Sequence, residues 1–200
     1  HDARPDYRER MDSFDGTVVF RIAPPFEDNL DWKYSDKRME EWFSRVVAQF
    51  EPDLVHFHCI QRITSSAIDV CRAKDLPYIV SVHDGWWLSD YQFLFDEKAR
   101  MRTPGDEIRL GPKPPLRLSD SLQRLAYLRN ALEGAKQVLT PSLEFEKIYA
   151  HAGFTNVSAL SNGLPKVAVA PRTRSRSGRV RLAHIGDTSP HKGFDLVEAA

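Results

Sequence analysis

Short apolar runs of strand length alternate along the chain with longer segments in which apolar residues recur every three or four positions. The first pattern predicts β-strands and the second predicts amphipathic helices. Strand, helix and strand follow one another with short joints, which is typical of a parallel sheet wound with right-handed crossovers. The fold class is therefore α/β. The predicted strands are 17–22, 54–58, 78–82, 137–140 and 157–160, and the predicted helices are 36–50, 64–74, 119–133 and 142–153.

Local signals predict how several of these elements begin and which side they bury. Ser35 is a candidate N-cap for the helix at 36–50, and Ser119 is one for the helix that ends near residue 133. Residues 1–16 are charged and carry no pattern until the turn pair at 15–16. The apolar residues expected on the inner side of the helix at 119–133 are Leu122, Leu125, Ala126 and Leu132.

The stretch after the predicted strand at 78–82 is the strongest candidate for a functional site. The strand is a near-continuous apolar run, as expected of a strand buried on both faces of a parallel sheet. His83 and Asp84 fall at its carboxyl end, the edge where open α/β sheets bind ligands. Gly85 then lets the chain turn sharply. An imidazole and a carboxylate are thus expected together at this edge.

Large flat side chains follow this pair, and two interpretations of them stay open. Trp86, Trp87 and Tyr91 favour a binding floor, because flat aromatic faces line many ligand sites. Alternatively, the two tryptophans together with Phe93 and Phe95 belong to the core, and the neighbouring histidine is a hydrogen-bonded structural residue.

Two more histidines alternate along the predicted strand at 54–58. Because alternate residues of a strand point to one face, His56 and His58 share a face. A metal pair is conceivable, but neither a carboxylate nor a third ligand stands near them in the sequence, so no metal site is predicted. His58 is the last residue of the strand and is expected to line the ligand edge.

Composition narrows the classes of partner and the compartment. Lys plus Arg equals Asp plus Glu at 28 each, so the formal net charge is zero and no nucleic-acid partner is predicted. Cys59 and Cys71 show neither the spacing of a zinc site nor that of a disulfide framework, which suits a reducing cytoplasm. No run approaches the roughly 18 apolar residues of a membrane span.

The character of the sequence changes twice in its second half. Residues 96–118 are polar and rich in proline and glycine, a candidate lid beside the site. Residues 166–179 mix proline, serine and arginine without a period and predict a linker. A buried strand is expected at 180–185, followed by a polar loop with Lys192 and a helix that opens at Phe194. This layout is that of an anion site at a helix N-terminus.

Three stretches together resemble the retaining glycosyltransferases of the GT-B group often called family 4, and the resemblance covers residues 54–200. They are the segment His83-Asp84-Gly85-Trp86-Trp87, the passage from Thr140-Pro141-Ser142 to Ser161-Asn162-Gly163, and the strand, loop and helix at 185–196. The resemblance implies two facing Rossmann-like domains. Residues 1–165 would be the acceptor-side domain, 166–179 the linker, and 180–200 the first strand and helix of the nucleotide-sugar domain.

The resemblance also implies roles for individual residues. His83 would be catalytic and orient hydroxyls of the transferred sugar, while Lys192 would meet the donor diphosphate. A cation there neutralises the charge of the leaving group, so neither a metal nor another cofactor is expected. The other implied donor-binding residues are Gly186, Asn162 and Gly163. The implied acceptor-binding residues are Asp84, Trp86, Trp87, Tyr91 and His58.

The sequence departs from the family pattern in two places. The family commonly has Gly-Arg where this chain has Gly186-Asp187, and its Gly-rich loop after the first strand is not seen. The first strand of the acceptor-side domain would lie outside these 200 residues. So would the Glu-containing donor motif, which is expected further into the second domain. The chain therefore resembles a fragment, which we expect to be inactive alone.

The resemblance implies a hexosyltransferase of polysaccharide biosynthesis that moves a sugar from a nucleotide-sugar donor to a glycan or lipid-linked acceptor. Two alternatives stay open. A non-catalytic carbohydrate- or partner-binding domain is favoured by Asp187, and a sugar-nucleotide epimerase shares the two-domain architecture. The expected location is the cytoplasm, at the inner face of the membrane if the acceptor is lipid-linked.

Overall fold

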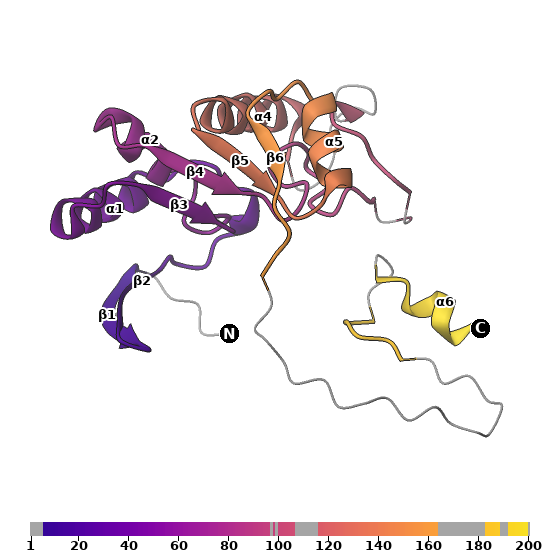
Figure 1. Cartoon of the computed structure of the whole chain (residues 1–200), viewed down its shortest axis with the longest axis horizontal. Helices are drawn as coiled ribbons and strands as arrows, with labels where there is room; N and C mark the ends of the chain where they lie inside the picture. The colour runs from indigo at the N-terminus through magenta and orange to yellow at the C-terminus, as the bar shows by residue number, and fades with distance from the viewer. Residues whose placement is uncertain are drawn as a thin grey trace.

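The computed structural model describes residues 6–96, 98, 100–106, 116–163, 183–188 and 192–199. Its centre is a four-stranded parallel sheet of order β3-β4-β5-β6, flanked by helices as predicted (Figure 1). Three of the strands begin within one residue of their predicted start, and the fourth prediction, for 137–140, matches β5 at both ends. The strands are β3 (Val55–His58), β4 (Tyr78–Ser81), β5 (Gln137–Thr140) and β6 (Val157–Ala159).

Helices connect these strands and enclose one hydrophobic core. The helices are α1 (Lys37–Phe50), α2 (Ser66–Ala73), α4 (Leu118–Glu133) and α5 (Leu143–His151). Phe57 on β3 and Val80 on β4 are buried in the core cluster, whereas His56 and His58, which flank Phe57, are exposed. Alternation along β3 therefore leaves its histidines on the face opposite to the core.

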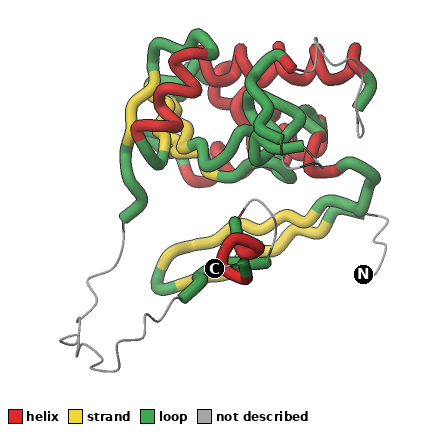
Figure 2. Tube along the Cα trace, turned by 90° about the vertical axis from the view of Figure 1, so that its right-hand side faces the viewer, coloured by secondary structure: helices red, strands yellow, loops and turns green. Residues whose placement is uncertain are grey.

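The N-terminal region differs from the prediction. β1 (Arg8–Phe14) pairs with β2 (Thr17–Ala23) in a separate antiparallel sheet, so the strand predicted at 17–22 exists but is not part of the parallel sheet. The turn pair Asp15-Gly16 has positive φ at both residues, as a tight hairpin requires. The polar sequence of β1 hid a strand that forms because this turn folds it back. Figure 2 shows the hairpin extending away from the four-stranded sheet.

The N-cap of α1 is Asp36 and not the predicted Ser35. Oδ1 of Asp36 accepts hydrogen bonds from the backbone N–H groups of Arg38 (2.9 Å) and Met39 (3.2 Å). Burial disfavours the charged carboxylate, but hydrogen bonds from Tyr7 and Lys33 outweigh it and hold the pKa of Asp36 below its usual range. A carboxylate caps the helix better than a hydroxyl here because these donors surround it.

The inner face of α4 was predicted incorrectly, apart from Leu132. The residues that α4 buries are Ser121, Arg124, Leu128, Ala131 and Leu132. Arg124 has no exposed side-chain surface, and its Nη1 lies 3.3 Å from Oδ1 of buried Asp90. Its Nη2 donates to the carbonyl oxygen of Trp86 at 2.6 Å, and Ser121 donates to Asp90. The pattern of apolar residues cannot reveal a buried cation. The face predicted to be buried is therefore rotated about the helix axis relative to the face that α4 buries. The helix also begins at Leu118, without the side-chain cap predicted for Ser119.

The C-terminal segment contains α6 (Phe194–Glu198), close to where the sequence predicted a helix to open. The buried strand predicted at 180–185 is not seen in its described part: Ala183 to Ile185 carry no strand, and Ile185 is 97% exposed. Residues 180–182, the linker at 166–179 and most of the polar loop after residue 106 lie outside the described residues. Within the described ranges, none of the helices has the length and apolar character needed to cross a membrane.

Candidate functional site

His83 and Asp84 lie just beyond the carboxyl end of β4, beside the ends of β3 and β5. The backbone N–H of Val82 still donates to Leu139 on β5 at 2.8 Å, so the sheet holds the chain up to the site. Both side chains are partly exposed. His58 ends β3 and Thr140 ends β5, so the parallel order brings three strand ends to one edge, as the sequence predicted.

The carboxylate of Asp84 is held in place by three donors. Oδ1 accepts from the backbone N–H of Trp86 at 3.0 Å, while Oδ2 accepts from Nε2 of Gln61 at 3.2 Å and of Gln92 at 2.7 Å. A carboxylate offers about four lone-pair positions, so about one remains for a ligand. The carboxylate is therefore oriented, and it is still able to accept a hydroxyl proton in a hydrogen bond.

The main chain of Asp84 is fixed as well. The hydroxyl of Tyr149 on α5 donates to its carbonyl oxygen at 2.9 Å. Tyr149 is fully buried, and this burial raises its pKa well above the ordinary value, so it stays a donor. Gly85 allows a close approach rather than a positive φ, because a Cβ there would stand 2.5 Å from Cδ2 of Leu94.

A cavity of about 410 Å³ opens beside this carboxylate. Six of its seven lining residues carry a carboxylate, a side-chain amide, a guanidinium or a thiol, which suits a ligand rich in hydroxyl groups. The volume is in the range of small-molecule sites. A larger cavity of about 520 Å³ lies between α4 and α5, but its wall is mainly apolar and contains neither His83 nor Asp84. We therefore take the polar cavity as the site. Its lining residues are Asp31, Cys59, Gln61, Arg62, Ile63, Asp84 and Gln92.

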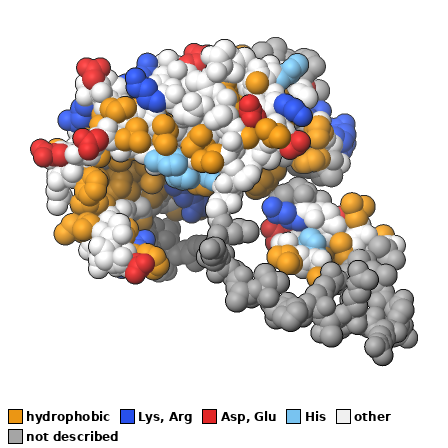
Figure 3. Space-filling model, viewed as in Figure 1, with side chains coloured by type: hydrophobic (Ala, Val, Ile, Leu, Met, Phe, Trp, Pro, Cys, Tyr) orange, Lys and Arg blue, Asp and Glu red, His pale blue; other side chains and the backbone are white. Residues whose placement is uncertain are grey.

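The three histidines of the sheet form a row next to the cavity. Nδ1 of His58 lies 3.2 Å from Nε2 of His83, and Nε2 of His58 lies 3.3 Å from Nδ1 of His56. Figure 3 shows histidine side chains gathered on the viewed face of the sheet. Burial, together with the neighbouring imidazoles, lowers the pKa of His58. His58 is therefore neutral at physiological pH.

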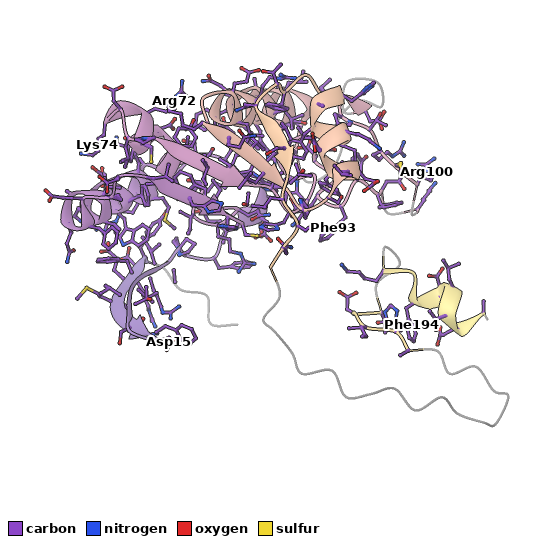
Figure 4. The ribbon with its side chains drawn as sticks, in the orientation of Figure 1. Asp15, Arg72, Lys74, Phe93, Arg100 and Phe194 are labelled. Carbon is purple, nitrogen blue, oxygen red and sulfur yellow. The ribbon has the colours of Figure 1, made fainter. Side chains whose placement is uncertain are left out.

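The tryptophans belong to the core and do not form an open floor. Trp86 is 1% exposed and Trp87 is 4% exposed, and their rings meet edge to face. The two tryptophans are therefore core residues, as the second interpretation of the sequence predicted. Their rings offer no open surface for the acceptor contacts that the family resemblance implies. Tyr91 is partly exposed, with the guanidinium of Arg102 over its ring. Phe93, 50% exposed, projects from the sheet domain (Figure 4), and Phe95 is exposed as well, so the core alternative does not describe these two residues.

The residues implied for donor binding lie in two parts of the chain. Asn162 and Gly163 are exposed and follow β6 at the carboxyl edge of the sheet. Gly186 and Lys192 are neighbours in the C-terminal segment, where a Cβ on Gly186 would lie 3.9 Å from Cγ of Lys192. Lys192 is exposed and precedes α6, so it is accessible to an anion.

Sequence reasoning missed the two amides that hold Asp84. Gln61 comes three residues after the end of β3, and a polar residue just past a strand end is a signal that could have found it. Gln92 sits eight residues after Asp84, and no pattern marks it. Within the described ranges, no group of three His, Cys, Asp or Glu residues is arranged to hold a metal ion.

Cys59 offers a chemical probe of the cavity. Burial and the charge of Asp84 raise the pKa of its thiol, and burial raises that of Cys71 to about 12. Because the thiolate is the nucleophile, iodoacetamide is expected to label exposed Cys59 more slowly than a free thiol at pH 8, and faster as the pH rises. Cys71 should stay unlabelled in the folded protein. Peptide mass mapping measures both rates, and equal labelling of the two thiols at pH 8 would contradict this placement.

A comparison with protein families finds one match. The family model described as "Glycosyl transferase 4-like domain" matches residues 2–163 of the chain, which includes the whole four-stranded sheet and the candidate site. Neither a curated protein nor a solved structure matches the chain.

Proposed function

Because this chain belongs to the glycosyl transferase 4-like family, we propose that it supplies the acceptor side of an enzyme that transfers a sugar from a nucleotide-sugar donor. The acceptor is a glycan or a lipid-linked sugar, and the configuration at the transferred carbon is retained. The observation that carries the proposal is the oriented carboxylate of Asp84 beside a polar cavity, with His83 at the same edge of the sheet.

The described side chains suit such a transfer. The remaining lone pair of Asp84 accepts a hydrogen bond from an acceptor hydroxyl, while Gln61 and Gln92 keep the carboxylate aimed at the cavity. His83 orients hydroxyls of the transferred sugar. The ammonium group of Lys192 stabilises the charge that grows on the departing diphosphate, which is the electrostatic contribution that such a reaction needs most.

Donor binding is the first property to measure. In a thermal-shift screen of the full-length protein with UDP, GDP, dTDP and ADP sugars, one nucleotide class is expected to raise the melting temperature. A ligand at about 100 times its Kd stabilises the native state by about 2.7 kcal/mol, which corresponds to a rise of several degrees. Lys192→Ala should abolish the shift, whereas Lys74→Ala, an exposed lysine at the end of α2, should keep it.

The outcome without any shift favours a second candidate function, a carbohydrate-binding domain without donor chemistry. The observation behind it is Asp187, whose carboxylate stands in the loop before Lys192 and repels a diphosphate. In that case free oligosaccharides, and not nucleotide sugars, should raise the melting temperature.

A further inference from the structure

The row of histidines is a hydrogen-bonded chain with a defined beginning and end. Nε2 of His56 lies 2.8 Å from Oγ of Ser81, and the contacts already described continue from His56 to His58 and from His58 to His83. Two members come from β3 and one from β4, with His83 just beyond the end of β4. They meet because the parallel register places His58 opposite Ser81 and alternate residues share a face.

The proton inventory of imidazole permits only two arrangements of this chain. A neutral ring has one donor nitrogen and one acceptor nitrogen. If Ser81 accepts, then every ring carries its hydrogen on Nε2 and Nδ1 of His83 is an acceptor. If Ser81 donates, then every ring carries its hydrogen on Nδ1 and His83 presents a donor. Each contact is satisfied in both arrangements, and no mixed arrangement satisfies all three.

Because His58 is the middle ring, it forces all three histidines to adopt the same tautomer. His58 uses both of its ring nitrogens, one toward each neighbouring histidine. A protonated His58 would carry two donors and break the order. The low pKa of His58, caused by burial and by the imidazoles on either side, keeps this ring neutral. The tautomer of His83 is thus coupled through His58 to His56 and Ser81.

A metal centre does not explain the row. The two nitrogens of His58 point to different partners, so the lone pairs of the three rings do not converge on one point. This agrees with the finding that no trio of possible ligands among the described residues is arranged for a metal ion.

We propose that His58 is a positioning residue that fixes the orientation of His83 and couples its tautomer to that of His56, with Ser81 completing the chain. The inference rests on the proposed function, because it takes His83 as the group that faces the sugar. No described residue hydrogen-bonds Nδ1 of His83, so this nitrogen is the end that a substrate hydroxyl meets. Nδ1 of His83 meets the hydroxyl as an acceptor in the first arrangement and as a donor in the second.

Two replacements of His58 separate this role from simple packing. Asparagine places a polar atom near the position of Nδ1 and keeps a contact to His83, whereas glutamine places one near Nε2 and keeps only the contact to His56. The primary readout is ¹⁵N NMR of histidine-labelled protein. His56 and His83 are expected to show the same tautomer proportions in the wild type, because the hydrogen bonds through His58 couple them. This match is expected to be lost in His58→Gln, where His83 has no partner. In His58→Asn His83 keeps a hydrogen bond, but its tautomer is no longer coupled to that of His56, because an amide can donate or accept. His151→Gln, at the exposed end of α5, controls for the loss of a histidine elsewhere.

Transfer rates provide the second readout. Loss of the group that orients a metal-binding histidine typically costs about 10- to 100-fold in activity. We expect a similar cost here, so kcat of the full-length protein should fall at least about tenfold in His58→Gln. In His58→Asn kcat should stay within about threefold, and in His58→Gln kcat should change more than the donor KM, because residue 58 does not itself contact the donor in this scheme.

Three results would overturn the proposal. The first is tautomer proportions of His56 and His83 that still match in His58→Gln, and the second is equal kcat values for the two variants. The third is a zinc-dependent rise in melting temperature that both variants lose, since this would show a metal site instead. The NMR result does not depend on donor binding, so a failure of the proposed function in the thermal-shift screen is distinguished from a failure of this inference.

Discussion

Replacing Arg124 with methionine is expected to lower the free energy of unfolding by about 3–5 kcal/mol. Arg124 is fully buried in α4, where its guanidinium lies against Asp90 and over the ring of Trp86. Methionine fills similar space but removes the positive charge that compensates the buried carboxylate. Urea unfolding followed by tryptophan fluorescence measures the loss, because Trp86 reports on this part of the core.

Two further variants test the cause. Arg62→Met breaks an exposed ion pair with Asp31 and should cost about 1 kcal/mol or less. Adding Asp90→Leu to Arg124→Met should recover much of the loss, because the carboxylate that needed compensation is then gone. Equal losses for Arg62→Met and Arg124→Met would show that burial of the ion pair does not matter.

In the full-length protein, replacing His83 with alanine is expected to lower kcat by about 10²- to 10⁴-fold, the usual range for a histidine that acts on a reacting group. The melting temperature should change little, because the side chain is partly exposed and its one hydrogen bond among the described residues is to His58. Steady-state kinetics with the donor class found in the thermal-shift screen, and a melting curve, measure the two effects.

The matched control is His151→Ala, which removes an exposed imidazole from the end of α5. It should keep both activity and melting temperature. If His83→Ala instead unfolds the protein, then His83 is a structural residue, and the carboxylate of Asp84 becomes the main candidate for the reaction centre.

The parallel sheet and the position of the site could be predicted because both follow from period and order. The strand predicted at 137–140 contains Val138 and Leu139 and lies between Gly134 and Pro141, and it matches β5 at both ends. His83 and Asp84 lie at the predicted edge because parallel strands always place their carboxyl ends together. These features depend on local sequence and on chain direction alone.

The features that were missed depend on contacts between distant residues. Arg124 is buried because its partner Asp90, 34 positions away, is buried beside it. The sequence around either residue does not predict the presence of the other. Gln92 reaches Asp84 only because the chain folds back over Gly85. The burial of Trp86 and Trp87 is decided by the helices that pack over them, since an aromatic pair is equally suited to a core and to a binding surface.

The hydrogen bond from Tyr149 to the main-chain carbonyl of Asp84 couples the position of α5 to that of the candidate site. Burial keeps the hydroxyl protonated far above neutral pH, so the connection does not open and close with pH. A rotation of α5 by a small angle would therefore displace the carboxylate and the turn at Gly85 as one piece. Substitutions on the face of α5 that packs against β5 and β6 are then expected to alter acceptor preference without touching the acceptor.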